Sequence, residues 1–94
     1  MNEKWRYTIT GTVQGVGYRN SILHFVNSNL KNTVGQVKNN SDGSVEIIAC
    51  GPISELKSLE DFAYKGSRFC NVENVVVEKN INININFTSF KITF

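Results

Sequence analysis

The chain has 94 residues, enough for a single domain over residues 1–94, and its 40% hydrophobic and 19% charged residues are typical of a soluble globular protein. This composition excludes a disordered chain, and no apolar run approaches the roughly 20 residues that a membrane-spanning helix needs. The net charge of +2 is weak and dispersed, so it gives no indication of a nucleic-acid partner.

The N-terminal residues and the cysteines bear on cellular location. Residues 1–10 contain no apolar stretch followed by a small-residue cleavage site, so we expect a cytoplasmic protein. Cys50 and Cys70 are then expected to be reduced thiols. With one histidine, His24, they are too few to form a zinc site, and we expect neither a metal nor another cofactor. His24 lies beside Phe25 in a helical segment and is expected to be structural.

The first half of the chain predicts a strand, a helix and a second strand. Residues 5–13 alternate between apolar and polar side chains, as in a half-buried strand. Gly15 and Gly17 interrupt this pattern, and apolar residues then recur at helical spacing over about residues 18–30. A short strand is predicted over residues 34–39.

A hairpin and a second helix follow. The Asp-Gly pair within residues 40–43 predicts a tight turn into a return strand over residues 44–50. Gly51-Pro52 separates that strand from the apolar stripe of a helix. We expect Ser54 to be its N-cap, Glu55 to lie in its first turn and Lys65-Gly66 to end it. The stripe is formed by Ile53, Leu56, Leu59, Phe62 and Ala63.

The remaining segments complete a sheet. Residues 72–78 are rich in valine and predict a fourth strand, and the alternation within residues 87–94 could add a short fifth edge strand. Two helices among such short strands pack most economically on one face of a four-stranded antiparallel sheet. This is the ferredoxin-like βαββαβ sandwich of the α+β class. The fold hosts many functions, so function has to be argued from the site.

The connection between the first strand and the first helix carries the most chemical information. Gly15 and Gly17 stand directly before Arg19. Backbone amides at such a glycine-rich helix N-terminus can converge on an anion, and a guanidinium adds a planar fork of donors. The pattern favours a phosphate or phosphoryl site, although a tight turn with a solvated Arg19 would use the same residues. The spacing matches neither the Walker nor the dinucleotide pattern, so no nucleotide is expected.

The end of the second strand holds another candidate, Asn39, directly before the hairpin turn. Asparagine tolerates turn conformations and bonds its own backbone, so its position alone favours a turn-forming or capping role.

Together these two segments resemble the acylphosphatase family. Residues 11–19 fit its first signature, Gly-x-Val-Gln-Gly-Val-x-aromatic-Arg, at every fixed position. Residues 35–46 resemble its second, Gly-x-Val-Lys-Asn followed by Asp-Gly-x-Val-Glu. With Gly51-Pro52 and Phe90-Lys91-Ile92, the resemblance covers residues 7–94. One departure is Gln36, where the family usually has an aromatic residue; it concerns packing, not chemistry.

The resemblance implies a small stand-alone enzyme of the same fold, and it assigns roles to residues. Arg19 would hold the phosphoryl oxygens, and Asn39 would position the attacking water. The phosphate cradle would consist of the backbone amides of Gln14, Gly15, Val16, Gly17, Tyr18 and Arg19. A monomer would hydrolyse small acyl phosphates to carboxylate and inorganic phosphate, with phosphate acting as a competitive inhibitor and with no metal, nucleic acid or membrane involved.

The chemistry of an acyl phosphate suits so sparse a site. Its leaving group departs as a stable carboxylate, so no general acid is required. Phosphoryl transfer passes through a loose transition state with charge spread over the equatorial oxygens. An anion cradle and an oriented water can therefore provide the catalysis.

Two other functions share these features. An RNA-recognition motif has the same topology but stacks bases on aromatic residues of its third strand, and residues 44–50 carry neither an aromatic nor a basic side chain. A non-catalytic phosphate-binding or regulatory domain would retain the glycine loop; the presence of both Arg19 and Asn39 favours the enzyme.

Overall fold

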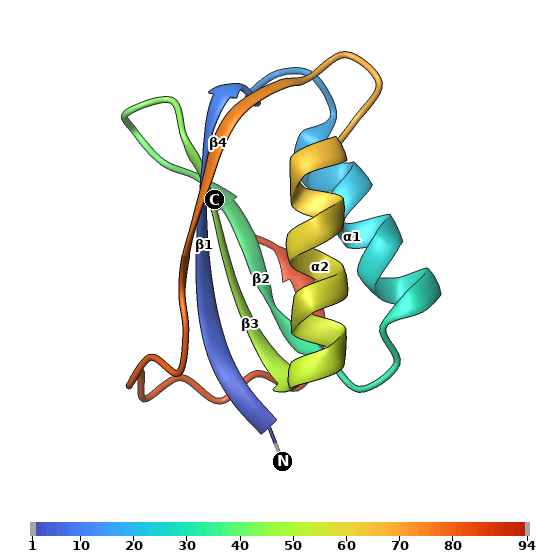
Figure 1. The fold of residues 1–94 in the computed structure, drawn as a ribbon, viewed down its shortest axis with the longest axis vertical. Helices are drawn as coiled ribbons and strands as arrows, with labels where there is room; N and C mark the ends of the chain where they lie inside the picture. The colour runs from blue at the N-terminus through green and yellow to red at the C-terminus, as the bar shows by residue number, and fades with distance from the viewer. Residues whose placement is uncertain (1, 94) are drawn as a thin grey trace.

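The computed structural model describes residues 2–93 and shows two helices on one face of a five-stranded sheet (Figure 1). The elements are β1 (Asn2–Thr12), α1 (Tyr18–Asn29), β2 (Val34–Asn39), β3 (Val45–Pro52), α2 (Ile53–Lys65), β4 (Asn71–Glu78) and β5 (Phe90–Ile92). The strand order is β4-β1-β3-β2-β5, with antiparallel pairing from β4 to β2. The prediction of a ferredoxin-like α+β sandwich is confirmed.

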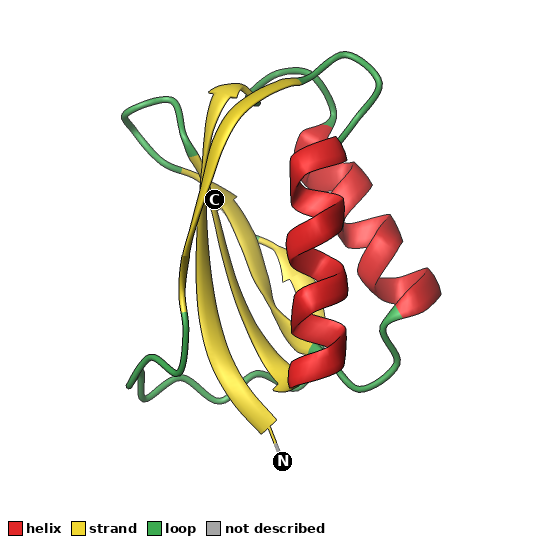
Figure 2. Cartoon of the chain, viewed as in Figure 1, coloured by secondary structure: helices red, strands yellow, loops and turns green. Residues whose placement is uncertain are grey.

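Alternation along the strands decides which face is buried. Trp5, Tyr7 and Ile9 of β1 are at most 1% exposed, and Val45 and Ile47 of β3 are fully buried beside them. These side chains form one core with the helices, which cover only this face of the sheet (Figure 2). The opposite face has no helix over it among the described residues.

The apolar stripes of both helices face that core. Ile22 and Val26 of α1 are at most 1% exposed, as the helical spacing predicted. Phe25 is partly buried and stacks on Phe62 of α2, with ring centroids 4.2 Å apart and planes 8° from parallel. Ile53 departs from the prediction, because it is 38% exposed at the start of α2 and lies outside the buried stripe.

The start of α2 differs from the sequence prediction. The helix begins at Ile53 with Pro52 at the N-cap position, so the prediction of Ser54 as the N-cap is wrong. Gly51 and Pro52 also complete β3 instead of forming a separate turn. The physical reason is that proline has an extended backbone here (φ −63°, ψ 145°), which suits the last strand position and the residue before a helix equally well.

Glu55 lies in the first turn of α2, as predicted. Its carboxylate accepts hydrogen bonds from Thr33 Oγ1 at 2.7 Å and from the Asn32 amide at 3.1 Å. These bonds satisfy the buried hydroxyl of Thr33 and attach α2 to the connection between α1 and β2.

The C-terminal segment forms the expected edge strand. β5 pairs parallel with β2, with Phe90 opposite Gly35, and Phe90 is only 6% exposed. Phe94, the last residue of the predicted alternation, lies outside the described residues.

The ends of other helices and strands differ from the sequence prediction by a few residues. β1 begins at Asn2 and not at Trp5, and α1 ends at Asn29 with Leu30 as its C-cap. Neither helix within residues 2–93 is long and apolar enough to cross a membrane.

Candidate active site

The loop between β1 and α1 is shaped by two glycines in the left-handed region. Gly15 has φ 73°, and Gly17, the N-cap of α1, has φ 78°. Other residues adopt this conformation only with strain. No side chain of the described residues caps α1, and its first turn contains no acidic residue. Backbone amides at such a helix end have a partial positive charge, which favours nearby anions.

A hollow of about 110 Å³ opens at this loop. It is lined by Val13, Gly15, Gly17, Tyr18, Arg19 and Asn20. Arg19 is the second residue of α1 and is half-buried, so its side chain starts from the helix end that borders the hollow. The hollow therefore lies at a helix N-terminus and is lined by one permanently charged residue, Arg19.

The hollow contains four of the six cradle residues expected from the sequence. Gln14 and Val16 are not among its lining residues, whereas Val13 and Asn20 are. Neither Val13 nor Asn20 was predicted as a site residue. Both could have been predicted from their position next to the glycine loop, since Val13 directly precedes Gln14 and Asn20 directly follows Arg19.

The side chain of Gln14 bonds to the hairpin between β2 and β3 and does not line the hollow. Its Nε2 donates to the carbonyl oxygens of Asn40 at 2.7 Å and Ser44 at 2.9 Å. Both acceptors belong to the hairpin between β2 and β3, so Gln14 attaches the glycine loop to that hairpin.

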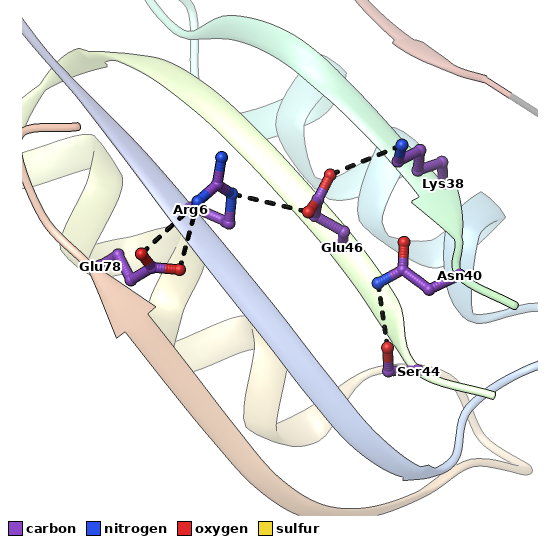
Figure 3. Close-up of polar contacts among 6 residues, drawn as sticks. All are labelled: Arg6, Lys38, Asn40, Ser44, Glu46 and Glu78. Carbon is purple, nitrogen blue, oxygen red and sulfur yellow. Dashed lines mark hydrogen bonds and ion pairs between the residues drawn. The ribbon is translucent and has the colours of Figure 1, made fainter. Parts of the chain in front are cut away.

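The hairpin itself is held by a compact set of hydrogen bonds. Asp42 Oδ1 accepts hydrogen bonds from Ser44 Oγ at 2.6 Å and from the Ser44 amide at 2.9 Å. Asn40 Nδ2 donates to Ser44 Oγ at 2.9 Å, as Figure 3 shows. The hydrogen bonds from Ser44 lower the pKa of Asp42 because they stabilise its ionised form, and the bond from the Ser44 side chain has the larger effect. Asp42 is a turn residue, not part of the hollow.

Tyr18 anchors the first turn of α1. Its ring is 1% exposed, and its hydroxyl donates to the carbonyl oxygen of Ala63 in α2 at 2.7 Å. Burial, and secondarily the nearby Cys70, raise the pKa of Tyr18 well above its ordinary value. A neutral, hydrogen-bonded phenol thus fixes the helix end that carries Arg19.

Asn39 lies at the same end of the sheet as the glycine loop. β1 and β2 both run antiparallel to β3, and Ile9 and Asn39 both pair with Val45. The two strands are therefore parallel to each other and separated by two strand spacings, roughly 10 Å. Asn39 Oδ1 is buried and accepts no hydrogen bond from any described residue. Such an atom is expected to have a partner, and a bound water would supply one.

Glu46, the last residue of the second signature, lies on the helix-free face. It is between Arg6 and Lys38, at 3.5 Å from Arg6 Nε and 3.8 Å from Lys38 Nζ, and Arg6 also lies 3.4 Å from Glu78 (Figure 3). These partly exposed ion pairs connect the strands from β4 to β2, and each contributes little to the stability of the fold. Glu46 is thus a strand-linking residue and not a member of the site.

His24, Cys50 and Cys70 are not among the residues that line the hollow. Residues 2–93 contain no cluster of three or more His, Cys, Asp or Glu side chains that could hold a metal ion. His24 is exposed on α1, and within the described part of the chain Cys50 and Cys70 are free thiols.

The sequence and the fold of this chain are similar to those of known proteins. The family model for acylphosphatase matches residues 5–92. An acylphosphatase of Koribacter versatilis is 43% identical over 77 residues, covering 82% of this chain and 68% of that protein. One from Bacillus velezensis is 37% identical over 84 residues, covering 89% and 90%. The crystal structure of the Bacillus subtilis acylphosphatase matches with a TM-score of 0.88 at 32% identity, covering 100% of both chains. The chain therefore belongs to the acylphosphatase family of hydrolases, which act on acyl phosphates.

Proposed function

We propose that the chain hydrolyses small acyl phosphates through direct attack of a water that Asn39 orients on a phosphoryl group held by Arg19 and the loop amides. The observation that carries this proposal is the buried Asn39 Oδ1, which accepts no hydrogen bond from residues 2–93 and lies at the same sheet end as the hollow beside Arg19. An oxygen in this situation is suited to accept a hydrogen bond from a bound water.

The phosphoryl group would be held mainly by charge. Its oxygens would accept hydrogen bonds from backbone amides of residues 14–19, aided by the positive end of α1. The Arg19 guanidinium can bind two phosphoryl oxygens at once and would balance charge that gathers there as the bond to the leaving group stretches. Because Gln14 and Tyr18 fix the loop on two sides, these donors would need little rearrangement during the reaction.

The proposed step balances without a cofactor. The water oxygen forms a bond to phosphorus on one side, while the bond from phosphorus to the acyl oxygen breaks on the other. The electron pair leaves with the carboxylate, and the proton lost by the water passes to phosphate or solvent. A carboxylate is stable at neutral pH, so no residue has to protonate it.

The deciding experiment measures hydrolysis of acetyl phosphate and benzoyl phosphate after exhaustive treatment with EDTA. We expect full activity without added metal and competitive inhibition by inorganic phosphate, which would occupy the cradle. Activity restored only by magnesium would contradict the proposed step. Phosphate binding without any hydrolysis would instead favour a regulatory phosphate-binding domain.

We also propose that the chain works as a monomer in the cytoplasm. Every group in the proposed site comes from one chain, and free Cys50 and Cys70 suit a reducing compartment. Light scattering during size-exclusion chromatography, combined with activity that stays proportional to enzyme concentration, tests the monomer.

A further inference from the structure

The connection between α2 and β4 displays an aromatic residue at the corner of a tight turn. The Cys70 amide donates to the Ser67 carbonyl oxygen at 3.3 Å, and Cys70 Sγ lies 3.1 Å from the same oxygen. Arg68 and Phe69 therefore occupy the two central positions of this turn. Phe69 is 74% exposed, more than any other large apolar residue that the structure describes as exposed. Turn corners favour small or polar residues, so neither the turn nor the core explains an aromatic ring here.

This turn is fixed beside the glycine loop. Ser67 Oγ donates to the Val16 carbonyl oxygen at 2.8 Å, and Asn71 at the start of β4 pairs with Thr12 at the end of β1. A Cβ added to Gly66 would collide with the Tyr18 ring, which lines the hollow. Both connections lie at the same end of the molecule (Figure 1). Phe69 is two residues from Ser67, at most about 7 Å along the chain.

The strand order places the turn on the side from which the leaving group would depart. The order is β4-β1-β3-β2, so Asn39 on β2 and the turn before β4 lie on opposite sides of the loop that follows β1. In a direct displacement the attacking water and the leaving group are in line on opposite sides of phosphorus. A water beside Asn39 would thus direct the acyl group toward β4.

We propose that Arg68 and Phe69 form a subsite for the acyl group and favour acyl phosphates whose acyl group is aromatic; this inference rests on the proposed function. The Arg68 guanidinium lies 5.6 Å from the centroid of the Phe69 ring, a cation–aromatic pair. A benzoyl ring would stack on the exposed side of this pair, since both aromatic faces and guanidinium planes accept stacked rings. An acetyl group offers a single methyl and gains little from such a surface.

The test compares benzoyl phosphate with acetyl phosphate in the wild type and in Phe69→Ala. We expect Phe69→Ala to raise the KM for benzoyl phosphate and to lower the ratio of the two kcat/KM values about three- to tenfold, the range expected for loss of one aromatic pair. The kcat/KM for acetyl phosphate and the inhibition constant of inorganic phosphate should stay near wild type. Phe69→Trp should preserve the ratio, and Arg68→Ala should lower it.

Ile53→Ala is the matched control, because Ile53 is also an exposed apolar residue but begins α2, about 20 Å along the helix from the turn. It should leave the substrate ratio unchanged. A second measurement avoids turnover: calorimetry should show that Phe69→Ala weakens binding of benzylphosphonate but not of methylphosphonate.

The outcomes separate this inference from the proposed function. If the wild type hydrolyses both substrates and Phe69→Ala leaves the ratio and the benzylphosphonate affinity unchanged, the subsite is overturned while the proposed function stands. An equal loss for both substrates also overturns the subsite. If the wild type hydrolyses neither substrate, the proposed function fails, and the subsite fails with it.

Discussion

Arg19 supplies the permanent positive charge of the hollow from the first turn of α1. Because its guanidinium would contact the phosphoryl group before and during bond breaking, Arg19→Ala should weaken phosphate inhibition and lower kcat/KM by about 100-fold or more. Arg19→Lys should recover little, since an ammonium cannot form the two-pronged contact. Steady-state kinetics with and without phosphate checks this. Lys31→Ala removes the same charge just beyond the far end of α1 and is the control; wild-type activity in Arg19→Ala would refute the assignment.

Asn39 is neutral, so it adds little attraction for a phosphate dianion. If its buried Oδ1 orients the water, Asn39→Ala should lower kcat about 100- to 1000-fold, roughly 3 to 4 kcal/mol, while the inhibition constant of phosphate stays near wild type. Asn39→Asp should be at least as harmful, because it places a negative charge near the phosphoryl oxygens.

Asn39 could alternatively have a structural role in the turn, and Asn39→Ala distinguishes this role from orientation of the water. A turn-forming residue would lower the melting temperature on substitution and leave kcat nearly intact. Asn29→Ala, which removes an exposed side-chain bond to Phe25, shows how much a purely structural asparagine contributes. If the phosphate inhibition constant worsens as much as kcat falls, Asn39 binds phosphate and does not orient water.

At the scale of elements, the Gln14 side chain joins the glycine loop to the β2–β3 hairpin. Gln14→Ala would remove the bonds to Asn40 and Ser44, which together contribute about 1 to 3 kcal/mol. We expect a melting temperature lower by several degrees. We also expect a kcat reduced about tenfold with little change in phosphate inhibition, because Asn39 would no longer be held in register with the loop.

Gln36→Ala is the control for that variant, since Gln36 lies on β2 but its half-buried side chain makes no hydrogen bond described within residues 2–93. A Gln14→Ala protein with a lower melting temperature and unchanged kcat would show that the connection stabilises the fold without positioning the site.

At the scale of the whole molecule, two buried phenols attach α2 to the rest of the fold. Tyr7 donates to the Leu56 carbonyl oxygen and Tyr18 to that of Ala63, each at 2.7 Å. Burial raises the pKa of both, with smaller effects from Glu60 and Cys70 respectively.

Their raised pKa values predict an alkaline loss of stability. Above the ordinary tyrosine pKa of about 10, the unfolded chain loses protons that the folded chain retains, so the free energy of unfolding should fall by about 1.4 kcal/mol per pH unit for each phenol. This stability is fully present below pH 10. Urea unfolding between pH 8 and pH 11 measures the slope, and Tyr18→Phe should remove its share. An unchanged slope in Tyr18→Phe would contradict the assignment.

The sequence by itself determined the local features of this protein. Alternation along β1 and the helical spacing of α1 report which face each element buries, so the core residues and the ferredoxin-like fold were predictable. The first signature likewise located Gly15, Gly17, Tyr18 and Arg19 of the hollow, because a hollow at a helix N-terminus is lined by residues close together in the chain.

Only the tertiary structure decided how distant segments meet. Gln14 reaches a carbonyl 26 residues away, and Ser67 contacts Val16 across 51 residues. The turn that carries the exposed Phe69 is brought next to the loop by the pairing of β4 with β1 and the bond from Ser67 to Val16. The parallel pairing of β5 with β2 has no sequence signal of its own. Periodicity reports the burial of one element at a time, whereas these contacts depend on strand order and register, which are set by the packing of the whole sheet.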